Sequence, residues 1–262
     1  MRLTIITILA ALVTLGLPPR TSVSEELTKL DEGFDHSNFH KILRQTVRDQ
    51  RVDYLAIRRD HRLLLKCYLD RLATFDPAPL QRQQKLALYI NLYNATVIDA
   101  VIERYRDGYR VSEKDFAVFK KSLVRVAGQT MSLNDLEHKL IRPRFKDPRV
   151  HAALVCAAGS CPALSPRAYH ARDLDEVLEM NVRCFIVDPC RNQVDHKKKQ
   201  LRLSKIFQWY ADDFGGKKAI AEYVNKYHPD EVGDYAVSFI EYSWDLNIVP
   251  QQQDASRTGN HE

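Results

Sequence analysis

Residues 132–162 read SLNDLEHKLIRPRFKDPRVHAALVCAAGSCP, and this stretch decides how the centre of the chain is expected to fold. Ser132 and Asp135 give the Ser-x-x-Asp signal that begins a helix. The apolar run over residues 150–158 predicts a continuous buried strand, which Gly159 ends. The stretch therefore predicts a helix, a strand and a turn that form a core unit.

Outside this stretch, apolar side chains at three- and four-residue steps predict mainly helices. The expected helices occupy much of residues 25–75, then 80–105, 174–185, 204–210 and a segment that ends near Tyr227, and the expected hairpins lie at 123–133 and 194–203. This order lacks the regular alternation of a doubly wound fold. We predict an α+β class: a helix-dominated single domain with a small sheet, over residues 25–250.

The two ends of the sequence differ from this domain. Arg2 precedes an apolar run over residues 3–17, and Pro18 and Pro19 end it, a pattern typical of a secretory signal peptide over residues 1–24. The run is shorter than the roughly 20 residues that span a bilayer, which favours cleavage over a retained anchor. We therefore expect an exported protein, periplasmic or extracellular, with no membrane span in the mature chain. Residues 251–262 are polar and predict a disordered tail.

The overall composition excludes some classes of partner. The formal charge of +5 is mild, and no stripe of lysine and arginine marks a nucleic-acid surface. With 45% apolar and 28% charged residues, the chain is typical of globular proteins. No sequence motif indicates a cofactor.

Two cysteines in the opening stretch are candidate nucleophiles. Cys161 precedes Pro162, and proline favours the first position of a helix. Because a helix N-terminus lowers the pKa of a thiol, this placement ranks Cys161 above Cys156.

The candidate bases are His151 and His138. His151 and Cys156 are five residues apart, so on a strand their side chains would point to opposite faces. Glu137 could orient the base, but on a helix it diverges from the adjacent His138 by about 100 degrees. Glu137, His138, His151 and the two cysteines are all zinc-ligand types, yet their spacing fits no metal motif, and we expect no metal site.

Asn94 is a second candidate for orienting the histidine. It shares one side of the predicted helix 80–105 with Asn91, three residues before it. Asparagine is a poor helix-interior residue, so the pair indicates a specific hydrogen-bonding task. The alternative task is to satisfy the backbone of a neighbouring loop.

The odd number of cysteines leaves their pairing open. An oxidising compartment favours disulfides, and five cysteines leave at least one unpaired within the chain. One arrangement joins Cys156 to Cys161 and Cys184 to Cys190, with Cys67 buried and free. A reversible Cys156–Cys161 redox pair is a further alternative, between a catalytic thiol and a structural disulfide.

Two further groups of side chains have less specific interpretations. Trp209, Tyr210, Asp212 and Asp213 would be recognition residues if the chain is a binding module; the simpler interpretation is core aromatics beside a helix start. Four histidines outside the opening stretch are expected at the surface or at helix ends: His36, His40, His61 and His228.

Five motifs in order make the chain resemble the domain of unknown function 547 family. They are LALYINLYNA (86–95), SLNDLEHKLIR (132–142), RVHAALVCAAGSCP (149–162), LSKIFQWYADDF (203–214) and YSWDLN (242–247). The resemblance implies which residues cluster and brings no activity with it. On the residues, we predict a cysteine-dependent hydrolase or acyl-transferase acting on an envelope substrate. The alternative is a non-enzymatic envelope module that binds a partner and has a structural Cys156–Cys161 disulfide.

Overall fold

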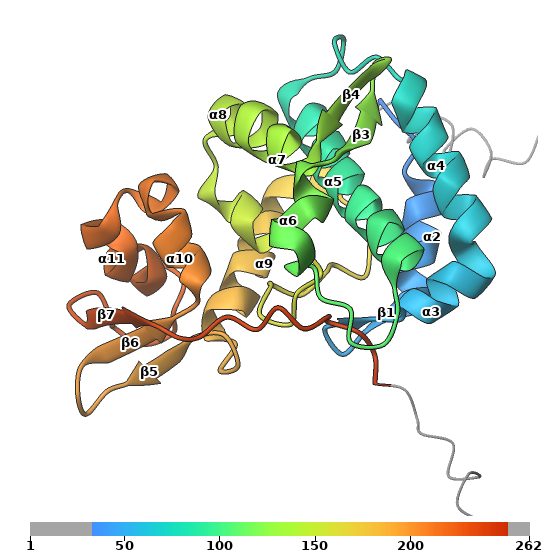
Figure 1. Ribbon diagram of the computed structural model, residues 1–262. Coiled ribbons are helices and arrows are strands. Elements are labelled where there is room, and N and C mark those ends of the chain that lie inside the picture. Colours follow the sequence, from blue (N-terminus) through green and yellow to red (C-terminus); the bar gives the residue numbers. More distant parts are fainter. Residues whose placement is uncertain (1–32, 251–262) are drawn as a thin grey trace, which may run out of the picture.

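The computed structural model describes residues 33–250, and α5 (Arg82–Arg104) is the helix around which the rest of the chain packs. Its side chains from Leu86 to Val97 are all buried, as in a helix enclosed on every side. Figure 1 shows α5 crossing the centre of the molecule. The predicted signal peptide, residues 1–24, and the predicted tail, residues 251–262, lie outside the described residues.

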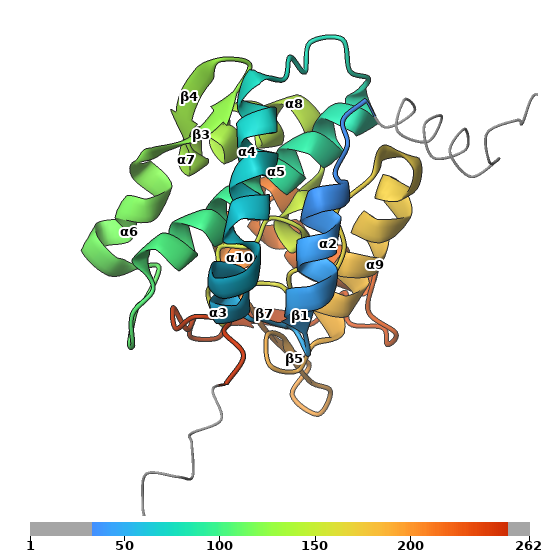
Figure 2. The same cartoon turned by 90° about the vertical axis from the view of Figure 1, so that its right-hand side faces the viewer.

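The remaining helices surround α5. Helices α2 (Ser37–Thr46) and α4 (Arg62–Thr74) lie side by side along one flank (Figures 1 and 2). The other α-helices are α3 (Tyr54–Ala56), α6 (Glu113–Lys120), α7 (Leu133–Asp135), α8 (Arg142–Phe145), α9 (Leu174–Val187), α10 (Lys205–Trp209) and α11 (Ile220–Asn225). Two π-helices are η1 (Ile57–His61) and η2 (Leu136–Ile141), and four 3-10 helices are η3 (Pro148–Ala152), η4 (Ala171–Asp173), η5 (Ala211–Phe214) and η6 (Lys217–Ala219). None of the helices in residues 33–250 has the length and apolar character that crossing a membrane requires.

The strands within residues 33–250 form three small sheets. Strands β1 (Val47–Arg48) and β2 (Arg51–Val52) make one antiparallel pair, and β3 (Ser122–Val126) and β4 (Gln129–Ser132) make another. At the second turn Ala127 and Gly128 both have positive φ, the conformation of a tight hairpin turn. Strands β5 (Gln193–Asp195) and β6 (Gln200–Leu203) pair antiparallel, and β7 (Ala236–Phe239) joins β6 in parallel.

After β7 the chain returns across the molecule, and we call residues 240–249 the C-terminal strap. The backbone of Gly159 donates to the carbonyl of Asp245, and that of Asn247 donates to the carbonyl of Ala157. The strap then reaches β2, where Val249 donates to the carbonyl of Val52. Figure 1 shows this path from β7 to β1. The strap therefore fixes the turn that contains the two candidate cysteines.

Two hydrophobic clusters fill the interior. The larger lies around α2, α4 and α5; the smaller gathers the side chains of α9, α10 and α11 with β6. Tyr242 of the strap packs against both clusters. The predicted class, a helix-dominated α+β fold with small sheets, is confirmed.

The predicted strand over residues 150–158 is wrong. The segment begins as the 3-10 helix η3 and continues without regular structure to Cys161. It is buried as expected, but its backbone hydrogen bonds go to side chains and to the strap instead of to a sheet. An apolar run indicates burial without specifying how the backbone is satisfied.

Candidate functional site

A pocket of about 260 Å³ lies where the two hydrophobic clusters meet the strap. It is lined by Tyr93, Phe116, Phe119, Lys120, Asn134, Glu137, His151, Leu154, Cys156, Cys161, Ile206, Trp209, Tyr210, Tyr242 and Trp244. Four of the six side chains predicted for the site are in this set. His138 and Asn94 are not.

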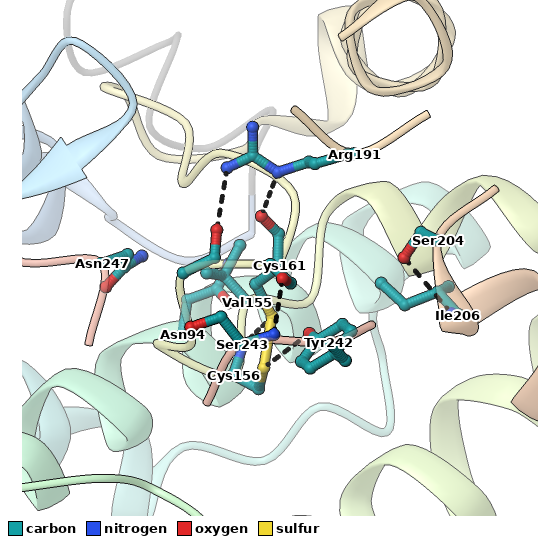
Figure 3. Close-up of a disulfide and its surroundings, with 12 residues drawn as sticks. Asn94, Val155, Cys156, Cys161, Arg191, Ser204, Ile206, Tyr242, Ser243 and Asn247 are labelled. Atoms are coloured by element: carbon teal, nitrogen blue, oxygen red, sulfur yellow. Dashed lines mark hydrogen bonds between the residues drawn. A yellow bond between two sulfur atoms is a disulfide. The ribbon is translucent and has the colours of Figure 1, made fainter. Parts of the chain in front are cut away.

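The two sulfurs form a disulfide on the pocket wall. Cys156 and Cys161 are bonded, with Cα atoms 6.3 Å apart. The Cys156 amide donates to Cys161 Sγ at 3.0 Å, and the Tyr242 hydroxyl lies 3.4 Å from Cys156 Sγ (Figure 3). Cys156 is partly exposed, whereas Cys161 is 2% exposed. Of the two residues, Cys156 is therefore the more exposed.

The other predicted cysteine pairing is wrong. Cys184 and Cys190 are both exposed and free, and Cys67 is exposed instead of buried. Cys184 lies on α9 and Cys190 in the turn that follows it, so both side chains face solvent.

Asn94 holds the loop that carries the site. From α5, its amide donates to the carbonyl of Ala153 and its oxygen accepts from the amide of Val155, both at 2.9 Å. Asn91 does the same for both backbone groups of Tyr169. These contacts match the alternative in which the asparagines satisfy a loop backbone, and they replace the predicted contact between Asn94 and a histidine.

The irregular loop also overturns the strand argument that separated two site residues. Because there is no strand, His151 and Cys156 are not confined to opposite faces, and both line the pocket. Nor does Pro162 start a helix: after Cys161 the chain has no helix until η4. The reason for ranking Cys161 above Cys156 is therefore lost.

An arginine from outside the loop fixes the turn between the cysteines. Arg191, 7% exposed, donates from Nε to the carbonyl of Cys161 at 2.6 Å and from Nη2 to that of Gly159 at 3.5 Å (Figure 3). Its guanidinium is in turn paired with Asp188. The buried carbonyl of Cys161, which has no sheet partner, is satisfied in this way.

His151 is oriented by a carboxylate that the sequence did not assign to it. His151 Nε2 lies 2.7 Å from Asp213 Oδ2, and Arg142 donates to both oxygens of Asp213, at 2.6 and 3.0 Å. Hydrogen bonds from His151 and then from Arg142 hold the pKa of Asp213 well below its usual range, although burial acts in the opposite direction. An ionised carboxylate only accepts, so Nε2 carries the hydrogen and Nδ1 of a neutral His151 is the basic nitrogen.

One feature of the sequence is a weak sign of this pair. Asp213 stands in the aromatic and acidic segment considered for recognition, and the ring of its neighbour Tyr210 lies 4.0 Å from that of His151. Asp213 comes from η5, 62 positions after His151, and no local spacing connects them.

Glu137 and His138 diverge as the helix geometry predicted. Glu137, 6% exposed, lines the pocket together with Tyr93 and Tyr210. Burial and the Glu137 carboxylate raise the pKa of both tyrosines, so both remain protonated donors. His138 is exposed, and its Nδ1 accepts from Arg142 Nη1 at 2.7 Å.

Aromatic rings make up the outer wall of the pocket. The ring of Tyr242 lies 4.9 Å from that of Trp209 and 4.5 Å from that of Trp244, and the two tryptophans stack at 5.6 Å. Trp209 is 47% exposed, too much for a core residue. The interpretation of Trp209 as a recognition residue therefore fits its exposure better than the interpretation as a core aromatic.

Residues 77–186 match a family described as "Protein of unknown function, DUF547". The match confirms the predicted resemblance over this segment, which includes α5, Glu137, His151 and both bonded cysteines. It ends before Asp213 and the strap. No curated protein and no solved structure matches the chain.

Proposed function

We propose that the protein is a cysteine-dependent hydrolase or acyl-transferase that acts in the cell envelope after export. The observation that supports this most strongly is that His151, paired with Asp213, lines the same cavity as both sulfurs. Nucleophile, base and orienting acid are the three parts of a cysteine acyl-transfer site. The envelope assignment rests on the pattern of residues 1–24 alone.

In the proposed mechanism the disulfide form is the resting state. A dithiol reductant transfers two electrons and two protons to the Cys156–Cys161 bond and is itself oxidised to a disulfide. Cys156 is the proposed nucleophile because it is the more exposed of the two residues. Cys161 then serves as the partner that masks it.

His151 is the proposed base. Its Nδ1 accepts the Cys156 proton, and the Asp213 carboxylate stabilises the imidazolium that results. The thiolate attacks an acyl carbon, His151 returns the proton to the leaving group, and a thioester remains on Cys156. Water completes hydrolysis, or an acceptor alcohol or amine completes transfer, and either step regenerates the thiol.

The hydroxyl of Tyr242 is a candidate donor to the developing oxyanion. It lies 3.4 Å from Cys156 Sγ, so it is near the atom that would attack. Burial raises the pKa of Tyr242, and the hydroxyl therefore stays protonated at neutral pH. A fixed donor at this position stabilises charge that appears in the transition state.

The test is acylation by an activated ester, p-nitrophenyl acetate, followed by mass spectrometry of the labelled peptide. We expect one acetyl group per chain on Cys156 in reduced protein and none in the disulfide form. Cys161→Ser should react without reductant, and Cys156→Ser should not react. Cys67→Ser, at an exposed free cysteine, is the matched control and should behave as the unsubstituted protein.

The disulfide itself favours a second candidate, a binding module in which the bond is structural. That candidate predicts that reduction, and Cys161→Ser, lower the melting temperature sharply without creating a reactive thiol. If acetyl groups appear on the exposed cysteines at the same rate as on Cys156, the binding module is the better account.

A further inference from the structure

The charges around the pocket leave one acidic group without a cationic partner. Asp213 is neutralised by Arg142, and Lys120 at the pocket lining is paired with Asp115 at 2.5 Å. Glu137 shares the pocket lining with the neutral side chains of Tyr93 and Tyr210 and, within residues 33–250, has no lysine or arginine in ion-pair contact. A carboxylate that is 6% exposed in such surroundings favours a cation from outside the chain.

The Glu137 carboxylate has capacity for that cation. An ionised carboxylate offers about four acceptor positions, more than the neighbouring hydroxyls of Tyr93 and Tyr210 can fill. The burial of Glu137 also restricts its side chain, which lowers the cost of ordering the carboxylate when a ligand binds. A charged N–H donor forms a stronger hydrogen bond than either hydroxyl.

The aromatic wall provides the second half of a cation site. Trp209, Tyr242 and Trp244 touch one another, and the edge of Phe116 packs on Trp244 at 4.7 Å. The faces of such rings attract ammonium groups, and tryptophan does so most strongly. The same rings accommodate the apolar carbons next to the charge.

We infer that this pocket binds an ammonium group on a short apolar chain, with Glu137 as its counter-ion and the Trp209–Tyr242–Trp244 wall against its carbons. At about 260 Å³ the pocket lies below the usual range of roughly 300–1,000 Å³, so it admits one small group. As a statement about substrate, the inference rests on the proposed function: the acyl donor or acceptor would carry a protonated amine close to Cys156. As a statement about binding, it rests on the pocket alone.

Tryptophan fluorescence reports on this pocket directly, because both tryptophans of the chain line it. Benzylammonium and benzyl alcohol share a ring and differ in charge, and tetramethylammonium carries a charge with no N–H. All three are titrated into the disulfide form of the full chain, with no turnover involved. We expect benzylammonium to bind at least about tenfold more tightly than benzyl alcohol, with tetramethylammonium also binding.

Glu137→Gln keeps the shape of the side chain and removes its charge. It should weaken benzylammonium binding about tenfold and leave benzyl alcohol unchanged. Glu179→Gln, at a carboxylate on the exposed side of α9, is the matched control and should change neither. If Glu137→Gln does not fold, the comparison of charged and neutral probes on the unsubstituted protein decides alone.

Equal binding of benzylammonium and benzyl alcohol would overturn the inference, and so would a Glu137→Gln variant that loses both equally. Because these titrations need no reactive thiol, the two proposals fail separately. Ammonium binding without acylation of Cys156 would remove the hydrolase and keep the site. Acylation of Cys156 without a preference for the ammonium probe would remove the ammonium site and keep the hydrolase.

Discussion

The regions around His36 and His151 each contain a buried histidine with a partner at 2.7 Å. His36, 2% exposed, faces the Tyr68 hydroxyl; His151, 5% exposed, faces the Asp213 carboxylate. The region of His36 is closed by Phe34, Tyr68 and His170. The region of His151 opens into the pocket. Burial and distance are thus nearly the same, while the partner and the access differ.

The partner decides what each imidazole can do. Burial, followed by the nearby His170, lowers the pKa of His36 to about 3, so this ring stays neutral and acts as a hydrogen-bonding core group. A carboxylate partner instead stabilises the charged ring that base catalysis creates. This contrast supports the role of base that we propose for His151.

The largest expected effect belongs to His36. Its pKa in the folded state is lower than the unfolded value of 6.5, so the unfolded chain binds more protons between these values. The free energy of unfolding should therefore fall as the pH drops below 6.5, by about 3 kcal/mol at pH 4. The free energy of unfolding of His36→Gln, measured by denaturant unfolding, should fall less between pH 7 and pH 4 than that of the unsubstituted protein. Equal losses in both proteins would show that His36 does not resist protonation.

Asn94 should show the next largest effect. Asn94→Ala leaves two buried backbone groups unsatisfied and should lower the free energy of unfolding by about 2 kcal/mol. Asn91→Ala, which removes the equivalent bonds to Tyr169, should cost about the same. Only Asn94→Ala should also weaken benzylammonium binding, because it loosens the loop whose Leu154 and Cys156 line the pocket. Equal effects of both variants on binding would contradict this assignment.

Asp213→Asn distinguishes the region of His151 from that of His36 by the way stability changes at acidic pH. The lowered pKa of Asp213 gives a stability contribution that is complete above the ordinary aspartate pKa near 4 and is lost as the pH falls through its folded-state value. The free energy of unfolding of the variant should be about 1 kcal/mol lower at pH 7. The variant should also lack the loss of stability that protonation of Asp213 causes at acidic pH. Denaturant unfolding at pH 7 and pH 3 measures both. An unchanged acid response would mean that the pair with His151 and Arg142 is not maintained in solution.

His138→Gln should have the smallest effect, within about 0.5 kcal/mol. The side chain is exposed and contacts Arg142 from outside the pocket. Neither thiol reactivity nor ligand binding should change, and thermal unfolding with probe titration checks both. A loss of reactivity would return His138 to the list of candidate bases.

Local sequence patterns correctly predicted the elements whose hydrogen bonds join residues that are close in the sequence. The apolar stripe gave α5, and the capping box at Ser132 and Asp135 is formed as expected. The hairpins β3–β4 and β5–β6 and the Ser204 cap of α10 were also predicted correctly. In each case the deciding contacts lie within a few residues.

The site depends on distant contacts that no local pattern encodes. The loop over residues 153–161 is shaped by Asn94, Arg191 and the strap. The apolar sequence of that loop fits a buried strand equally well, which is why the strand was predicted. His36 was expected at the surface or at a helix end; it occupies the N-cap position of α2, without a side-chain capping bond, and is buried because Phe34 and Tyr68 cover it.

The central claim is that His151 and Asp213 activate Cys156. The most direct measurement is the pH dependence of iodoacetamide alkylation of Cys156 in Cys161→Ser, with the exposed cysteines replaced (Cys67→Ser, Cys184→Ser, Cys190→Ser). Our account predicts a rate curve with its midpoint below about pH 7, which His151→Gln moves upward and His138→Gln does not. A midpoint near 8.5, unchanged by His151→Gln, is that of an ordinary thiol and would contradict it.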